Sequence, residues 1–180
     1  MPNDQTKTVS LSLGGNIGNV TSSFIQALLG LAKTPGVALR RASSIYSTPP
    51  WGKLDQPIFL NMAALIETSL SPHAILALCL ALEREMGRVR KERWGPRTLD
   101  IDILTYGDQS IDAPDLKTPH PHLAERAFVL APLAEIAPRL VVKGQDIAEW
   151  LAQADRTGVE IDVEATRRLR EALHGISSEA

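Results

Sequence analysis

The sequence predicts an α+β fold built on a largely antiparallel sheet. Some segments alternate apolar and polar residues, as half-buried strands do, and others place apolar residues at helical spacing. The two kinds of segment follow one another without the strict strand–helix alternation that a parallel sheet requires. The chain has 180 residues, of which 44% are hydrophobic and 22% charged. This size and composition are typical of a globular domain, and we expect residues 1–180 to form a single one.

The first expected strand is the alternating segment TVSLSL, residues 8–13, which ends at the Gly14-Gly15 pair. A helix is expected to follow over residues 21–33, because Pro35 and Gly36 then stop it. The next expected elements are a strand-rich segment (37–48), a loop with three prolines (49–57) and a second extended segment (58–70).

Ser71 and Pro72 predict the start of another helix, since serine caps a helix N-terminus and proline fits the first turn. Apolar residues recur along one stripe of this helix as far as Met86, and Gly87 ends it. The remaining expected elements, in chain order, are a basic loop (88–97), a strand (98–107), two segments packed on the sheet (120–138 and 146–153) and a last helix (165–175).

Composition and charge exclude several classes of protein. The net charge of −2 argues against a nucleic-acid partner held by bulk electrostatics. The N-terminal residues lack the features of a signal peptide, and no apolar segment approaches the roughly 20 residues that span a membrane. The single cysteine, Cys79, excludes an internal disulfide and lies in an apolar run where we expect a buried, inert thiol. We therefore expect a cytoplasmic protein without membrane contact.

The segment RWGPRTLDIDIL, residues 93–104, carries two aspartates in an otherwise apolar run. Side chains two residues apart in a strand share a face, so Asp100 and Asp102 should project together while their neighbours pack on the other side. Adjacent carboxylates repel each other unless a cation neutralises them, and Mg²⁺ is commonly shared between carboxylates and substrate phosphates. The alternative for so short a pattern is a solvated strand face with two unremarkable acids.

A basic loop comes directly before these aspartates. Five of the 19 lysines and arginines of the chain fall within residues 88–97. Arginine suits bidentate phosphate binding, and cationic side chains stabilise the charge on a phosphoryl group in transfer. A solvated charge run is the alternative, but arginines next to metal-binding carboxylates are the groups that phosphoryl transfer needs.

At this point the residues resemble a known family. RWGPRTLDIDIL is similar to the signature of the 6-hydroxymethyl-7,8-dihydropterin pyrophosphokinases of folate biosynthesis. The resemblance covers about residues 8–152, and we expect residues 153–180 to form a helical C-terminal extension. Its other blocks occur in the family's order: LGGNIGN (13–19), YSTPPWGKLDQPIFLNMAALIETSLSP (46–72), LEREMGRVRKERWGPRTLDIDIL (82–104) and PHPHLAERAFVLAPLAEIAP (119–138).

The resemblance implies a three-layer α/β/α sandwich related to the ferredoxin-like fold. It also implies an enzyme that moves the pyrophosphoryl group of ATP to the hydroxymethyl group of the dihydropterin and releases AMP. The implied cofactor is Mg²⁺, as two ions, and the implied partners are these two small substrates. We expect a monomer that binds neither nucleic acid nor a membrane.

The same resemblance implies roles for individual residues. Asp100 and Asp102 would hold the metal ions, and with Arg88 and Arg97 they would be the catalytic residues. The implied pterin-binding residues are Thr48, Pro49, Phe59, Asn61, Trp94, Asp100 and Phe128. The implied ATP-binding residues are Leu76, Glu83, Arg88, Arg90, Trp94, Arg97, Ile103, His120 and Arg126.

Other interpretations are weaker but distinct. His120 and His122 lack the further cysteine or histidine ligands of a zinc site. The GGNIG segment lacks the Gly-Lys-Ser/Thr ending of a phosphate-binding P-loop and predicts a tight turn. Another Mg²⁺-dependent enzyme, such as a nucleotidyltransferase, could use the same aspartate pair. An RNA-binding module on a ferredoxin-like sheet is disfavoured by the negative net charge and the mid-strand aspartates.

Overall fold

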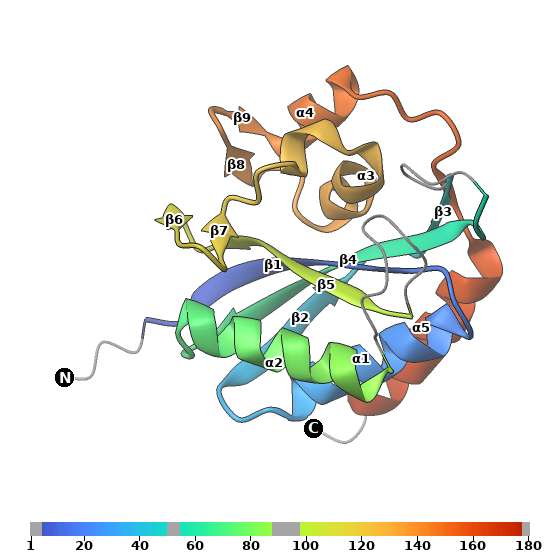
Figure 1. Cartoon of the computed structure of the whole chain (residues 1–180), viewed down its shortest axis with the longest axis horizontal. Coiled ribbons are helices and arrows are strands. Elements are labelled where there is room, and N and C mark those ends of the chain that lie inside the picture. Colours follow the sequence, from blue (N-terminus) through green and yellow to red (C-terminus); the bar gives the residue numbers. More distant parts are fainter. Residues whose placement is uncertain (1–4, 50–54, 88–97, 178–180) are drawn as a thin grey trace.

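The protein is a three-layer sandwich in which helices cover both faces of one central sheet (Figure 1). The structure, a computed structural model, describes residues 5–49, 55–87 and 98–177. One face of the sheet is covered by α1 (Val20–Lys33), α2 (Pro72–Glu85) and α5 (Val163–Ser177), and the other by α3 (Ala127–Ile136) and α4 (Ile147–Gln153). This arrangement confirms the predicted mixture of helices with an antiparallel sheet.

The central sheet has the strand order β10-β3-β4-β1-β5, and each of these neighbours pairs antiparallel. A sixth strand, β2, pairs antiparallel with the half of β4 that β3 leaves free. The strands of this sheet are β1 (Lys7–Gly15), β2 (Val37–Ala42), β3 (Tyr46–Thr48), β4 (Phe59–Thr68), β5 (Asp100–Tyr106) and β10 (Glu160–Ile161). The smaller elements are the hairpins β6 (Ile111–Asp112) with β7 (Lys117–Thr118) and β8 (Val141–Val142) with β9 (Gln145–Asp146), and the 3₁₀ turn η1 (Leu123–Glu125).

The helix ends follow the capping rules that the sequence suggests. Ser71 precedes α2 and its hydroxyl accepts a hydrogen bond of 3.2 Å from the backbone N–H of Ala74. Gly87 follows α2 with a φ of +75°, a backbone conformation that glycine adopts without steric cost. Asn19 caps α1 in the same way as Ser71 caps α2. Both helices therefore lie within two residues of their predicted positions.

Two hydrophobic cores lie on opposite sides of the sheet, because alternate residues of each central strand face opposite layers. In β4, Met62 and Ala64 belong to the first core, which lies under α1 and α2. Ala63 belongs to the second core, which lies under α3 and α4. Cys79 is fully buried in the first core, as expected. Burial, and secondarily the charge of Glu83, raises the pKa of this thiol to about 12.

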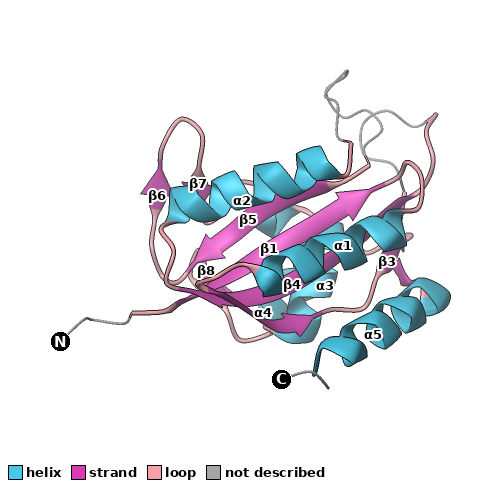
Figure 2. Ribbon diagram, turned by 90° about the horizontal axis from the view of Figure 1, so that it is seen from below, coloured by secondary structure: helices cyan, strands magenta, loops and turns pink. Residues whose placement is uncertain are grey.

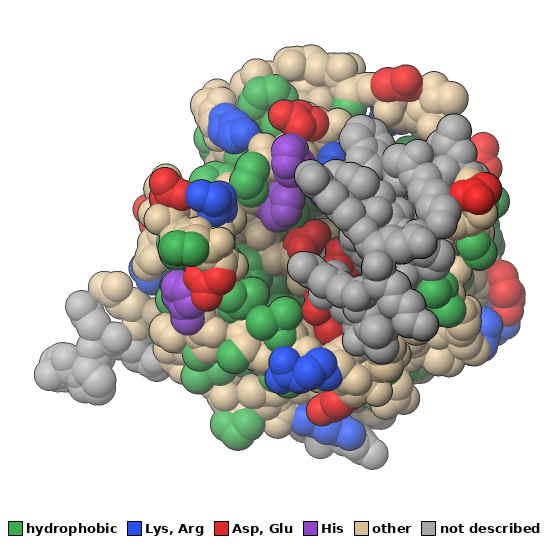
Figure 3. All heavy atoms as spheres, viewed as in Figure 1, with side chains coloured by type: hydrophobic (Ala, Val, Ile, Leu, Met, Phe, Trp, Pro, Cys, Tyr) green, Lys and Arg blue, Asp and Glu red, His purple; other side chains and the backbone are tan. Residues whose placement is uncertain are grey.

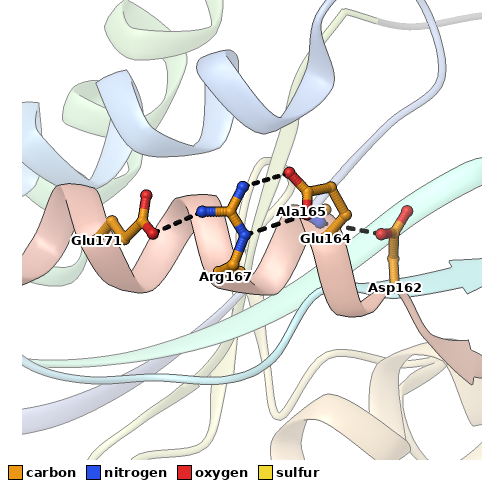
Figure 4. Close-up of polar contacts among 5 residues, drawn as sticks. All are labelled: Asp162, Glu164, Ala165, Arg167 and Glu171. Carbon is orange, nitrogen blue, oxygen red and sulfur yellow. Dashed lines mark hydrogen bonds and ion pairs between the residues drawn. The ribbon is translucent and has the colours of Figure 1, made fainter.

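The C-terminal helix α5 lies beside α1 on the outer face of the first core (Figure 2). Asp162 caps its N-terminus through a 3.0 Å hydrogen bond from the backbone N–H of Ala165. On its exposed side, Arg167 bridges Glu164 and Glu171 (Figure 4). Among the described residues, no helix is long and apolar enough to cross a membrane.

Candidate active site

A pocket opens on the sheet face that α3 covers. In the space-filling view, acidic side chains lie inside a hollow on this side of the molecule, near histidine side chains (Figure 3). The pocket combines carboxylates, aromatic rings and an arginine from strands and from α3. Its lining residues are Ser12, Gly14, Thr48, Pro49, Phe59, Asn61, Asp100, Asp102, Arg126, Phe128 and Val129.

The register of three neighbouring strands places the aspartates in this pocket. Asp102 pairs with Ser12 of β1, and Asp100 pairs with Gly14 of the same strand. Gly14 in turn pairs with Asn61 of β4, so a row of polar groups crosses the sheet from β5 to β4. Ile101, between the two aspartates, points into the opposite core and is 4% exposed. The common orientation of Asp100 and Asp102 is therefore confirmed.

Gly14 leaves room in the pocket floor for the side chain of Asn61. A Cβ atom added at Gly14 would lie 2.8 Å from Oδ1 of Asn61, which is closer than Cβ contacts normally come. The other end of the Asn61 amide is fixed, because its Nδ2 donates a 2.7 Å hydrogen bond to Oγ1 of Thr48. Asn61 is 5% exposed and is thus held in one orientation, with an amide oxygen over a glycine in the floor of the pocket.

Two aromatic side chains reach the pocket from different layers. Phe59 begins β4, where it pairs with Thr48, and Phe128 lies in the first turn of α3. Arg126, just before α3, places its guanidinium carbon 5.8 Å from the centre of the Phe128 ring. Both rings line the pocket, so a flat heteroaromatic ligand that enters it can contact aromatic surface.

An irregularity in β5 lies where the backbone of His120 contacts the strand. The pairing of β5 with β1 shifts register so that Leu104 has no partner in β1. Its carbonyl oxygen accepts a 2.8 Å hydrogen bond from the backbone N–H of His120. Such bulges redirect the chain next to functional sites, and here the bulge follows Asp102 by two residues.

His120 is held as a neutral imidazole. Its Nδ1 accepts a 3.1 Å hydrogen bond from the backbone N–H of His122, which places the ring proton on Nε2. Burial, followed by the positive charge of Arg126, lowers the pKa of His120 to about 4. Near neutral pH the side chain can donate one hydrogen bond without adding a charge.

The described residues contain no group of three or more histidine, cysteine, aspartate or glutamate side chains placed to hold a metal ion. The sequence disfavours zinc at His120 and His122, whose ring centres lie 6.0 Å apart, because no further cysteine or histidine ligand accompanies them. Two carboxylates suit a Mg²⁺ ion that takes its other oxygen ligands from water and from substrate phosphates. The donor set at Asp100 and Asp102 fits that description.

Four of the described residues that were expected to bind ATP lie outside the lining of this pocket, namely Leu76, Glu83, Ile103 and His120. Glu83 of α2 is 3% exposed, and its Oε1 accepts a 2.8 Å hydrogen bond from the backbone N–H of Ile101. Ile103 and Leu76 pack in or against the first core, on the opposite side of the sheet from Asp100. Their predicted contact with a nucleotide stays a prediction.

Four further predicted residues, Arg88, Arg90, Trp94 and Arg97, lie outside the described residues. The predicted residues that the structure brings together in one pocket are Thr48, Pro49, Phe59, Asn61, Asp100, Asp102, Arg126 and Phe128. The pocket also contains three residues that sequence reasoning did not select, namely Ser12, Gly14 and Val129. A signal for Ser12 was present, because the alternation of TVSLSL places its serines on one face of the first strand.

Comparison with known proteins identifies close relatives. The family model described as 7,8-dihydro-6-hydroxymethylpterin-pyrophosphokinase matches residues 10–138. A 2-amino-4-hydroxy-6-hydroxymethyldihydropteridine pyrophosphokinase of Methylorubrum extorquens is 49% identical over 150 residues, which are 83% of this chain and 95% of the relative. The enzyme of that name from Pseudomonas aeruginosa is 43% identical, over 84% of this chain and 94% of the relative.

Solved structures support the fold. A crystal structure of Plasmodium falciparum HPPK-DHPS matches 85% of this chain with a TM-score of 0.67 and 15% sequence identity. The chain spans 44% of the length of that solved protein. At this identity the likeness concerns the arrangement of helices and strands alone.

Proposed function

The chain belongs to the 7,8-dihydro-6-hydroxymethylpterin-pyrophosphokinase family, and we propose that the pocket beneath α3 is its active site. The protein is an ATP-dependent enzyme that transfers the pyrophosphoryl group of ATP to the hydroxymethyl group of 6-hydroxymethyl-7,8-dihydropterin in folate biosynthesis. The observation that carries the assignment of the site is the meeting of the aspartate pair of β5 with two phenylalanines in one pocket. Carboxylates for a metal ion and rings for a flat acceptor are both needed by this reaction.

Asp100 and Asp102 are proposed to hold Mg²⁺, as two ions. Bound there, the metal would neutralise phosphate charge and lower the pKa of the acceptor hydroxyl. The contribution of the chain is to fix both carboxylates on one face of β5 by its pairing with β1. Because this pairing places both carboxylates on one face before the substrates bind, little reorganisation should be needed.

Phe59 and Phe128 are proposed to stack on the two faces of the pterin ring, and Asn61 to bind its edge. The hydrogen bond from Asn61 to Thr48 supports this role, since it fixes the direction of the amide before a ligand arrives. Pro49 would close the wall next to Thr48. Asp100 and Trp94 are proposed to complete the pterin-binding part of the site, called the acceptor half below.

Arg126 and His120 are proposed to bind the phosphates of ATP from the α3 side. Arg126 supplies a fixed positive charge and neutral His120 a hydrogen-bond donor, a combination that suits phosphoryl oxygens. Arg88 and Arg97 are proposed as catalytic residues whose positive charges stabilise the pyrophosphoryl group during its transfer. The other residues proposed to line the nucleotide site are Leu76, Glu83, Arg90, Trp94 and Ile103.

The enzyme is proposed to act as a monomer that binds neither nucleic acid nor a membrane. The expected cytoplasmic location stays a prediction, as does the expectation of a single domain.

Product analysis tests the function directly. The purified protein is incubated with Mg²⁺, ATP and 6-hydroxymethyl-7,8-dihydropterin, and the products are separated by chromatography. We expect AMP and the pterin diphosphate in equal amounts. Release of inorganic pyrophosphate with a nucleotidyl product would indicate a nucleotidyltransferase instead and would overturn the proposal.

A further inference from the structure

The C-terminal segment, defined here as residues 155–177, forms the outer edge of the sheet next to the pocket. Its strand β10 pairs with β3, with Glu160 opposite Ser47 and Ile161 opposite Tyr46. Residues 155–177 lie beyond the part of the chain that the family model matches, which ends at residue 138. The edge of β3 is therefore covered by residues additional to the matched region.

This contact continues beyond the paired residues at Ile45, the residue before β3. The backbone N–H of Asp162 donates a 2.8 Å hydrogen bond to the carbonyl oxygen of Ile45. The backbone N–H of Ile45 donates a 2.9 Å hydrogen bond to Oγ1 of Thr166, which is 5% exposed. Two hydrogen bonds thus join Ile45, the residue before β3, to the N-terminal end of α5.

The α5 helix is itself anchored, so it can act as a rigid support. Ala165 and Leu169 are 5% and 1% exposed in the first core. On another side of the helix, Nη2 of Arg170 donates a 3.2 Å hydrogen bond to Oγ of Ser44. Oγ of Ser44 also donates a 2.5 Å hydrogen bond to Oε1 of Glu135, which belongs to α3. The segment before β3 is therefore connected to helices on both faces of the sheet.

At the other end of β3, Gly158 lies directly against Pro49. A Cβ atom added at Gly158 would lie 2.6 Å from Cγ of Pro49 and 3.0 Å from its Cδ. Pro49 lines the pocket, and it follows Thr48, the residue that orients Asn61. The φ of Gly158 is +78°, so two requirements select glycine there, the backbone conformation and the space taken by the proline ring.

From these contacts we infer that the C-terminal segment is a positioning element of the acceptor half of the active site. It holds β3 and Pro49 so that the pocket wall and the Thr48–Asn61 pair are in place before the pterin binds. Gly158 and Thr166 are the positioning residues, and they act on the ligand through Pro49 and Ile45. The inference rests on the proposed location of the pterin site.

The test compares two glycines that have the same backbone conformation. Gly144, in the β8–β9 turn, has a φ of +82°, and a Cβ added there meets no atom within 4 Å. Gly158→Ala and Gly144→Ala therefore carry a similar backbone cost, and only Gly158→Ala presses on Pro49. We expect Gly158→Ala to raise the KM for the pterin by about tenfold, with the KM for ATP unchanged, and Gly144→Ala to leave both constants unchanged.

A double-mutant cycle identifies the route through Pro49. In a Pro49→Ala background the ring atoms Cγ and Cδ are absent, so Gly158→Ala should raise the pterin KM no further. If Gly158→Ala does not fold well enough to be measured, Thr166→Val tests the same idea at the other end of β3. Thr166→Val should raise the KM for the pterin alone, and Thr166→Ser, which keeps the hydroxyl, should restore it.

The results separate this inference from the proposed function. An Asn61→Ala variant is measured in parallel, since Asn61 lines the pocket itself. If Asn61→Ala weakens pterin binding but neither Gly158→Ala nor Thr166→Val changes the pterin KM, the inference is wrong and the assigned site stands. Equal effects of Gly158→Ala and Gly144→Ala would also overturn it. If Asn61→Ala leaves pterin binding unchanged, the assigned site is wrong.

Discussion

At the scale of single residues, the proposed chemistry depends first on Asp102. Asp102→Asn keeps the shape of the side chain but removes the charge that would bind a metal ion. We expect kcat to fall by roughly a hundredfold or more, because metal binding is proposed to stabilise the transition state by several kcal/mol. The dependence of the rate on Mg²⁺ concentration and the circular dichroism spectrum are measured for both proteins.

Asp108→Asn is the matched control for this prediction. Asp108 lies in the exposed turn that follows β5, outside the pocket. Its substitution should leave the rate and the Mg²⁺ dependence unchanged. An Asp102→Asn protein with normal activity per folded molecule would show that Asp102 does not bind the metal.

His120 should make the stability of the protein depend on pH. Its folded-state pKa of about 4 lies below its ordinary value of 6.5, so the unfolded chain binds the proton more readily. As the pH falls from about 6.5 to about 4, the unfolded state gains protons that the folded state does not bind, and the free energy of unfolding decreases. Below about 4 both states are protonated, and this contribution no longer changes.

The measurement is the midpoint of urea unfolding across this pH range. His120→Gln should flatten the part of the curve between pH 6.5 and 4, since glutamine does not titrate. His174→Gln serves as the control, because His174 is exposed on α5 and outside the pocket. A His120→Gln curve parallel to that of the wild type would contradict the depressed pKa.

At the scale of secondary-structure elements, β5 is an edge strand whose outer side is secured by α2. Strand β5 pairs only with β1 in the described sheet, and Oε1 of Glu83 accepts the backbone N–H of Ile101. Glu83→Ala removes this acceptor from a buried donor, which should lower the free energy of unfolding by about 1–3 kcal/mol. Because Ile101 separates Asp100 from Asp102, kcat should fall as well.

Glu85→Ala is the control for Glu83→Ala, since Glu85 is exposed on the same helix two residues later. It should change neither stability nor rate. Loss of stability in Glu83→Ala with an unchanged kcat would show that the carboxylate supports the strand without positioning the aspartates.

The elements themselves were predictable, and the reason is that their signals are local. Ser71 and Gly87 mark the ends of α2, and the alternation of residues 8–13 marks β1. The common face of Asp100 and Asp102 follows from the two-residue period of a strand. Each of these features depends only on residues close together in the sequence, and each is confirmed.

Features that depend on distant pairing were not predictable in this way. The bulge at Leu104 arises from the register between β5 and β1, and the carbonyl oxygen of this residue accepts a hydrogen bond from the backbone N–H of His120. Likewise, the last helix was expected from its own pattern, but its contact with β3 through Thr166 joins residues 121 positions apart. The roles assigned to individual site residues stay predictions until variants are measured.

At the scale of the whole molecule, the question is whether α5 belongs to the same cooperative unit as the sheet. Leu169 is 1% exposed and packs in the core that also contains residues of β1, α1 and α2. Leu169→Ala should therefore lower the free energy of global unfolding by about 2–5 kcal/mol. Arg167→Ala, which removes the exposed ion pairs of α5 (Figure 4), should leave it nearly unchanged, because such pairs are screened by solvent.

Unfolding in urea is followed both by far-ultraviolet circular dichroism, which reports all helices, and by the fluorescence of tryptophans, including Trp150 of α4. Since Trp150 packs against the core on the other side of the sheet, a cooperative molecule should give the same midpoint with both signals, shifted equally by Leu169→Ala. If α5 were a separately folding extension, Leu169→Ala would shift only part of the dichroism change and leave the fluorescence midpoint in place. That result would contradict the prediction of a single domain and would also leave β3 without the rigid support that the C-terminal segment is proposed to give it.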